Sequence, residues 1–240
     1  MASPTKPCFD VLLLGKTGHG KSATGNSILG SRTFKVSSST SPETSEVSKI
    51  WTERDNCVIK VIDCPGIGKT RLDKPEAVNK AMEDLSKAMI TCPGGLHALL
   101  FVYKFGSWFN EEEQARIDFL KGVLGKDVFE KYGVCVMTNG DNFRGAMEEE
   151  ETPQKTPLVW CREQNNTFSC LVKECGDRLV MFDNRSKDQK IKHDQVEELV
   201  KLLRALPNHE LYTNKQLTQM HKEREKLTLK TKLPQMEEQI

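Results

Sequence analysis

The strongest constraint on this chain is residues 15–22, which read Gly-Lys-Thr-Gly-His-Gly-Lys-Ser and match G-x-x-x-x-G-K-[ST] at every fixed position. A short apolar run, residues 9–14, precedes this segment, and the sequence predicts a helix over residues 21–29. Glycines let the backbone turn tightly, and successive N–H groups ahead of a helix can then face an anion. The segment therefore predicts a phosphate-binding loop between a buried strand and a helix.

The residue types in this loop indicate separate roles. We expect Lys21 to reach the β- and γ-phosphates of a nucleotide and Ser22 to offer its hydroxyl to Mg²⁺. His19 is expected to contribute its backbone, and we assign its imidazole no catalytic role. The expected contacts of the loop are Gly15, Lys16, Thr17, Gly18, His19, Gly20, Lys21, Ser22 and Ala23.

Strand-like and helix-like segments alternate along the rest of the chain. The predicted strands are 9–14, 46–54, 57–62, 97–103, 133–138 and 178–182, and the predicted helices are 21–29, 76–91, 111–124, 167–175 and 188–206. Residues 31–46 are expected to be a mobile polar loop, and residues 142–165 a long acidic loop. The alternation predicts a three-layer α/β fold with a mostly parallel sheet, which binds ligands beyond the carboxyl ends of its strands.

A second motif follows the third predicted strand, where residues 63–66 read Asp-Cys-Pro-Gly and fit D-x-x-G. We expect Asp63 to hold Mg²⁺ and the N–H of Gly66 to meet the γ-phosphate. A threonine between the two motifs would complete the site, and both Thr40 and Thr44 lie in the polar loop, with Thr44 preferred. The expected metal ligands are thus Ser22, Thr44 and Asp63, and the residues expected to act in catalysis are Lys21, Thr44 and Gly66.

A third motif, Thr138-Asn139-Gly140-Asp141, follows the strand at 133–138 and is similar to the guanine-binding pattern [NT]-K-x-D. Asp141 stands where a carboxylate would accept hydrogen bonds from N1–H and N2–H of guanine, donors that adenine lacks. Thr138 fits the first position, whereas Asn139 replaces the lysine that normally packs beside the base. Taken alone, these four residues are equally a turn signal. Asn184, after the last predicted strand, is a candidate for contact with the base from the other side.

Charge and composition restrict the class of protein further. The formal net charge is +1 and the aromatic residues do not alternate with basic ones, which argues against a nucleic-acid partner. The sequence lacks an apolar run of signal-peptide type, a Met-Gly start and a C-terminal prenylation cysteine. A soluble cytoplasmic protein without a membrane anchor in this chain is therefore expected. The eight cysteines match no zinc-ligand spacing, and we expect buried reduced thiols.

Together these residues resemble the AIG1/IAN family of immune-associated nucleotide-binding proteins, the GIMAP group. Residues 15–29 match the extended phosphate loop of the family, and residues 93–100 resemble a P-G-P-H-A-L-L box that general small GTPases lack. Residues 181–188 are similar to the F-D-N-K-T-K-D of plant-like members, which also carry a lysine-poor T-x-G-D. The resemblance covers a G domain at residues 8–206 and leaves 207–240 as a charged helical or flexible extension.

The resemblance implies a Ras-like sheet of six strands, one of them antiparallel, flanked by helices and followed by extra C-terminal helices. It also implies exchange of GTP and GDP and nucleotide-dependent homodimers or oligomers formed through the switch regions. Some members place an arginine shortly after the H-A-L-L strand, and this arginine acts across the dimer. Trp108 stands at that place here, and no glutamine follows Gly66, so slow GTP hydrolysis is expected.

Three classes of function are consistent with these motifs. The leading hypothesis is a Mg²⁺-dependent, GTP-binding switch with weak GTPase activity. A P-loop ATPase or small-molecule kinase would instead prefer ATP and would not need Asp141. A scaffold would hold a nucleotide that never turns over, and its oligomers would ignore the state of that nucleotide.

Overall fold

The computed structural model describes residues 6–36, 47–54, 56–64, 75–107, 110–164, 166–207, 210–213 and 215–219, with the backbone alone for residues 75–77. Its strands are β1 (Cys8–Leu14), β2 (Ser48–Glu53), β3 (Val58–Asp63), β4 (Ala98–Lys104), β5 (Gly133–Thr138) and β6 (Leu179–Phe182). They form one sheet in the order β2-β3-β1-β4-β5-β6. Only β2, within these ranges, runs antiparallel to its neighbour. The expected mostly parallel sheet of six strands is confirmed.

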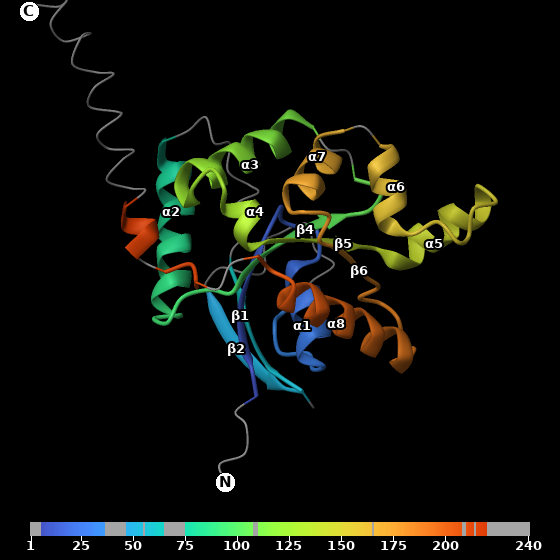
Figure 1. Ribbon diagram of the computed structural model, residues 1–240, viewed down its shortest axis with the longest axis horizontal. Helices are drawn as coiled ribbons and strands as arrows, with labels where there is room; N and C mark the ends of the chain where they lie inside the picture. Colours follow the sequence, from blue (N-terminus) through green and yellow to red (C-terminus); the bar gives the residue numbers. More distant parts are fainter. Residues whose placement is uncertain are drawn as a thin grey trace, which may run out of the picture.

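Helices cover both faces of this sheet (Figure 1). They are α1 (Lys21–Leu29), α2 (Pro75–Ile90), α3 (Glu111–Leu124), α4 (Val128–Tyr132), α5 (Gly140–Glu149), α6 (Pro157–Glu163), α7 (Thr167–Glu174) and α8 (Gln189–Arg204). Residues of α1 and α8 pack against one face, and residues of α2 to α7 pack against the other. Every helix in the described part of the chain is too short or too polar to cross a membrane.

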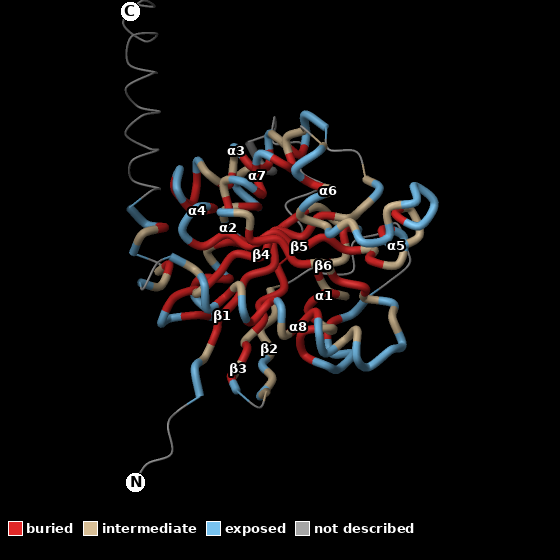
Figure 2. Tube along the Cα trace, turned by 45° about the vertical axis from the view of Figure 1, so that its right-hand side comes forward, coloured by how far each residue is buried: buried red, intermediate tan, exposed pale blue. Residues whose placement is uncertain are grey.

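The central strands are apolar along their whole length because both of their sides are covered. In β1, Leu12 and Leu14 pack in the cluster on the α2 side, whereas Val11 and Leu13 pack in the cluster on the α1 side. Figure 2 shows the result, a buried band of strands at the centre, with exposed chain on the outer helices, the connections and parts of the edge strand β2. This arrangement places the carboxyl ends of the parallel strands β3, β1, β4, β5 and β6 along one edge.

The expectation of a long loop at residues 142–165 was wrong, because α5 and α6 occupy most of this segment. Phe143 and Met147 are four residues apart on α5, and both are buried in the core. Thr156 caps α6 by accepting a hydrogen bond from the N–H of Val159. The acidic residues 148–151 end α5 on its exposed side. A further correction concerns Cys170, which is exposed on α7, although most of the cysteines are buried as expected.

The segment after α8 returns to the sheet side covered by α2. Leu96 and Tyr212 exchange two backbone hydrogen bonds, with N···O distances of 2.7 and 2.8 Å. The Tyr212 hydroxyl also donates to the carbonyl oxygen of Leu124, at 2.9 Å. Leu217 is buried in the same core cluster. The described parts of the C-terminal segment, residues 210–213 and 215–219, are therefore packed on the domain.

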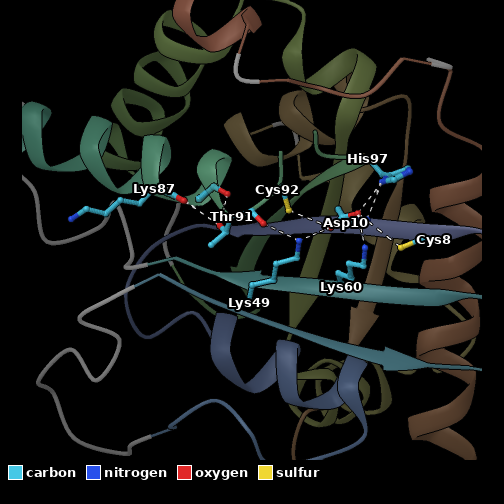
Figure 3. A network of polar contacts seen from close by, with 9 residues as sticks. Cys8, Asp10, Lys49, Lys60, Lys87, Thr91, Cys92 and His97 are labelled. Carbon is cyan, nitrogen blue, oxygen red and sulfur yellow. Dashed lines mark hydrogen bonds and ion pairs between the residues drawn. The ribbon is translucent and has the colours of Figure 1, made fainter. Parts of the chain in front are cut away.

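A polar cluster around Asp10 joins three strands near the start of β1 (Figure 3). The Asp10 carboxylate lies 3.2 Å from Nζ of Lys49 in β2 and 3.9 Å from Nζ of Lys60 in β3. The Cys92 thiol, just after α2, lies 3.2 Å from the same carboxylate. The backbone N–H of Asp10 donates to Nδ1 of His97, at 2.9 Å. The β2–β3 hairpin is thus bound to β1 by side chains as well as by the sheet.

Candidate nucleotide-binding site

The phosphate loop connects β1 to α1 and lies against β4. A Cβ atom added to Gly15, whose φ is +130°, would lie 2.3 Å from the carbonyl oxygen of Val102. Only glycine therefore allows the loop to approach β4 this closely. Gly20, at φ 94°, is the N-cap of α1 and has no side chain to cap the first N–H groups of the helix. Such a helix start is suited to an anion.

Lys21, the first residue of α1, lies inside the loop with only 7% of its surface exposed. Its Nζ donates to the carbonyl oxygen of Lys16, at 3.3 Å, and the N–H of His19 donates to the same oxygen, at 3.2 Å. Burial lowers the pKa of Lys21, and the nearby charge of Asp63 opposes this shift. A buried ammonium group beside oriented N–H groups can bind a polyphosphate strongly, because little water screens it.

Ser22 and Asp63, two of the expected magnesium ligands, meet across the end of the sheet. The Ser22 hydroxyl donates to Oδ2 of Asp63, at 2.5 Å, and Asp63 is 1% exposed. Asp63 ends β3, where it pairs with Leu13 of the adjacent β1, so the sheet itself places it beside the phosphate loop. A hydroxyl and a carboxylate are hard oxygen donors of the kind that Mg²⁺ prefers. The two residues fit this ion and would hold it here.

His19 is buried at 6% exposure, with its ring edge-on to Tyr103 at a centroid distance of 5.6 Å. Burial, together with the positive charges of Lys16 and Lys21, lowers the pKa of His19 to about 4. The imidazole is therefore neutral at pH 7 and adds no charge to the site. Its backbone has a different contact, because the hydroxyl of Thr138 donates to the carbonyl oxygen of His19, at 2.8 Å. This bond ties the phosphate loop to the expected base-binding motif.

The four residues of that motif bridge β5 and α5. Thr138 ends β5, and Asn139 is the N-cap of α5 with φ 64° and ψ 46°, in the left-handed region. Asparagine adopts this region more readily than lysine, which gives a backbone reason for the replacement noted in the sequence. Asp141 lies in the first turn of α5, half-buried. A Cβ atom on Gly140 would lie 3.2 Å from Cβ of Asp183, so the motif contacts the end of β6 directly.

Asn184, the other candidate for base contact, is held by α1. Its Nδ2 donates to the hydroxyl of Thr24, at 3.0 Å, and its Oδ1 accepts from the hydroxyl of Ser27, at 2.8 Å. Both ends of the amide are engaged, so the side chain joins the loop after β6 to the helix that begins at the phosphate loop. Contact between Asn184 and a base stays a prediction.

Four residues singled out in the sequence, Thr40, Thr44, Gly66 and Trp108, lie outside the described residues. The remaining expected residues of the phosphate loop, from Lys16 to Ala23, lie between β1 and the first turn of α1. The structure thus brings three expected motifs to one edge of the sheet: the phosphate loop, Asp63 and the segment 138–141.

Sequence reasoning missed two charged residues beneath the phosphate loop. Glu113 of α3 is 1% exposed, and its Oε1 lies 3.0 Å from Nη1 of Arg116 and 3.8 Å from Nζ of Lys16. Glu113 is the last of three consecutive glutamates in the first turn of α3. Its spacing from Ile117 and Leu120, which are four and seven residues further on and buried in the core, is the signal that could have placed it on the inner face.

The sheet order and the loop between β1 and α1 define the fold of P-loop GTPases. Solved structures with this fold include Toc33 from Arabidopsis thaliana in complex with GDP and Mg²⁺, at a TM-score of 0.57 and 19% identity, over 85% of this chain and 88% of that one. Era in complex with MgGDPNP and nucleotides of 16S ribosomal RNA has a TM-score of 0.57 at 19% identity, over 86% of this chain and 59% of that one.

Within this fold class the chain belongs to the AIG1 family, whose model matches residues 9–232. The match runs past residue 206 into the C-terminal segment. Immune-associated nucleotide-binding protein 9 of Arabidopsis thaliana is 32% identical over 206 residues, which cover 85% of this chain and 57% of that protein. Immune-associated nucleotide-binding protein 8 of the same plant is 30% identical over 231 residues, covering 94% and 62%. The chain thus spans less than two thirds of the length of these relatives.

Proposed function

We propose that this chain is a Mg²⁺-dependent switch that binds GTP and GDP, hydrolyses GTP slowly and forms dimers or oligomers that depend on the bound nucleotide. The contact between Ser22 and Asp63 beside the buried Lys21 is the observation that carries the proposal, because it joins a phosphate loop to an oxygen-rich metal site. Relatives named as nucleotide-binding proteins and a similar fold solved with GDP and Mg²⁺ support it. We place this activity in the cytoplasm.

In this proposal each motif binds a different part of the nucleotide. The N–H groups of residues 15–23 and the ammonium of Lys21 bind the phosphates, and Asp141 accepts hydrogen bonds from guanine. Ser22, Thr44 and Asp63 hold Mg²⁺, which neutralises phosphate charge when it is bound. Thr44 and Gly66 meet the γ-phosphate, so that the segments 37–47 and 66–75 respond to its presence.

The first test is the preference for the base. We expect the chain to bind fluorescent GDP and GTP analogues at least about 100-fold more tightly than the ATP analogue in the presence of Mg²⁺. Asp141→Ala should remove this preference, because two hydrogen bonds to a carboxylate are worth about 3 kcal/mol or more. Titration of wild type and variant, with and without Mg²⁺, measures both effects.

Two outcomes would contradict this part of the proposal. Equal or tighter ATP binding that ignores Asp141 would reassign the chain to the ATPase or kinase class. Nucleotide that stays bound without ever turning over, with oligomers that ignore its state, would favour the scaffold.

The second test concerns turnover and assembly. A single-turnover GTPase rate on the order of 10⁻³ s⁻¹ or slower is expected, because this value is typical of GTPases without an arginine finger. Light scattering should show association with a non-hydrolysable GTP analogue and none with GDP, and Thr44→Ala and Asp63→Ala should each remove the difference. A fast single-turnover GTPase rate for the isolated protein would disprove the proposal that it hydrolyses GTP slowly. Association unchanged in both variants would disprove the switch.

A further inference from the structure

Asp183, the residue just after β6, is held from several directions although no motif of the sequence assigns it a role. It is 4% exposed. Its Oδ1 accepts hydrogen bonds from the backbone N–H groups of Arg185, at 3.2 Å, and Ser186, at 3.0 Å. Its own N–H donates to Oε1 of Gln195 in α8, at 3.0 Å. The carboxylate therefore fixes the shape of the loop that carries Asn184.

The second carboxylate oxygen of Asp183 contacts helix α5. Oδ2 accepts a hydrogen bond from Nη2 of Arg144, which lies on α5 three residues after Asp141. This bond pairs a carboxylate that is 5% exposed with a guanidinium that is 47% exposed. The close approach of Gly140 to Asp183 lies on the same side of the sheet. The segment that carries Asp141 and the loop that carries Asn184 thus meet at one buried carboxylate.

The strand register explains why a side-chain contact is needed between the segments that follow β5 and β6. Thr138 and Phe182 are paired at the ends of the parallel strands β5 and β6, and beyond them the backbone ladder stops. The two following segments then depend on side chains for their spacing. The lysine of the usual [NT]-K-x-D motif is absent, and Asn139 stands in its place. Arg144 supplies a long cation from the next turn of the helix.

We propose that Arg144 and Asp183 are positioning residues that set the spacing between Asp141 and the loop 183–186, and that this spacing determines the selectivity for guanine. The inference rests on the proposed function, because it concerns the base-binding side of the same site. Selectivity depends on how well Asp141 aligns with the two donors of the base, and binding groups need supporting residues that hold them to about 0.5 Å. Arg144 and Asp183 act through this alignment alone.

The test compares two ion pairs whose arginines are similarly exposed, although the Asp183 side chain is 5% exposed and the Asp177 side chain 35%. Arg144→Met removes the guanidinium from Asp183, whereas Arg162→Met removes a guanidinium that is 52% exposed from Asp177, away from the base motifs. Arg144→Met should lower the melting temperature more than Arg162→Met, because Asp183 is buried and Asp177 is partly exposed. We expect Arg144→Met to reduce the ratio of GDP to ADP affinity at least about tenfold, the equivalent of one charge-assisted hydrogen bond. Arg162→Met should leave the ratio unchanged, and Arg144→Lys should restore most of it.

The outcomes separate this inference from the proposed function. An unchanged ratio in Arg144→Met, with a lowered melting temperature, would show that the ion pair only stabilises the fold, and would overturn the inference. If Arg144→Met does not fold, Asp183→Asn keeps the acceptor for residues 185 and 186 but loses the charge, and the same reduced ratio is expected. A wild-type protein that binds GDP and ADP equally would refute the proposed function and this inference with it.

Discussion

Replacing Gly15 with alanine is expected to weaken GDP binding at least about 100-fold while the sheet still folds. The added Cβ would lie 2.3 Å from the carbonyl oxygen of Val102, and the φ of +130° is itself unfavourable for any residue with a side chain. The phosphate loop has to move away from β4, at a cost of about 3 kcal/mol or more. Calorimetric titration with GDP and far-ultraviolet circular dichroism would measure binding and folding separately.

Gly18→Ala is the matched control for this substitution. Gly18 lies in the same loop with φ +84°, but a Cβ atom there would meet nothing within 4 Å. Only the backbone penalty remains, which is about 1–2 kcal/mol. An equal loss of affinity in the two variants would mean that backbone conformation, and not the contact with β4, controls the loop.

Glu113→Ala is expected to lower the free energy of unfolding by about 3–5 kcal/mol, as is typical when one partner of a buried ion pair is removed. The glutamate carboxylate pairs with Nη1 of Arg116 and lies near Nζ of Lys16, and both Glu113 and Arg116 are almost fully buried. Removing the carboxylate takes its 3.0 Å partner away from the buried guanidinium of Arg116. Urea unfolding followed by tryptophan fluorescence would measure the change.

Glu112→Ala is the control that distinguishes the effect of losing a buried carboxylate from the effect of losing an acidic charge. Glu112 precedes Glu113 on α3 and also contacts Arg116, at 3.4 Å, but its side chain is 67% exposed. Exposed pairs of this kind contribute less than about 1 kcal/mol. A loss as large as that of Glu113→Ala would show that the number of acidic residues at the start of α3 matters more than the buried contact.

Much of the fold could be predicted because its strands are continuous apolar runs followed by exact motifs. The run 9–14 and the phosphate loop fixed the place of β1 and α1, and the family resemblance implied the antiparallel strand. The segment 142–165 was mistaken for a loop because its charge concealed the apolar pair Phe143 and Met147. Two large apolar positions are too few to reveal a helix in a segment with so many charged residues.

The positions of the phosphate loop and of Asp63 at one edge of the sheet were predictable, because local sequence places them at strand ends. The contacts of a side chain were not predictable where its partners lie far away in the sequence. The amide of Asn184, for example, bonds Thr24 and Ser27, more than 150 residues earlier in the chain, and its expected contact with the base stays a prediction. Glu113 and Asp183 look like ordinary acidic residues in the sequence, because only the packing of α3 and β6 makes them buried.

The cluster around Asp10 determines how the β2–β3 hairpin can respond to a ligand. Lys49 and Lys60, one on each strand of the hairpin, both contact this single carboxylate of β1. A slide of two residues along β1 would carry Lys60 roughly 6.6 Å away and break both ion pairs. The two ion pairs therefore hold the hairpin in place along β1. In the sequence the hairpin lies between the segments 37–47 and 66–75, which are proposed to respond to the γ-phosphate. If those segments respond to the γ-phosphate as proposed, we expect the strands that connect them in the sequence to keep their position on β1.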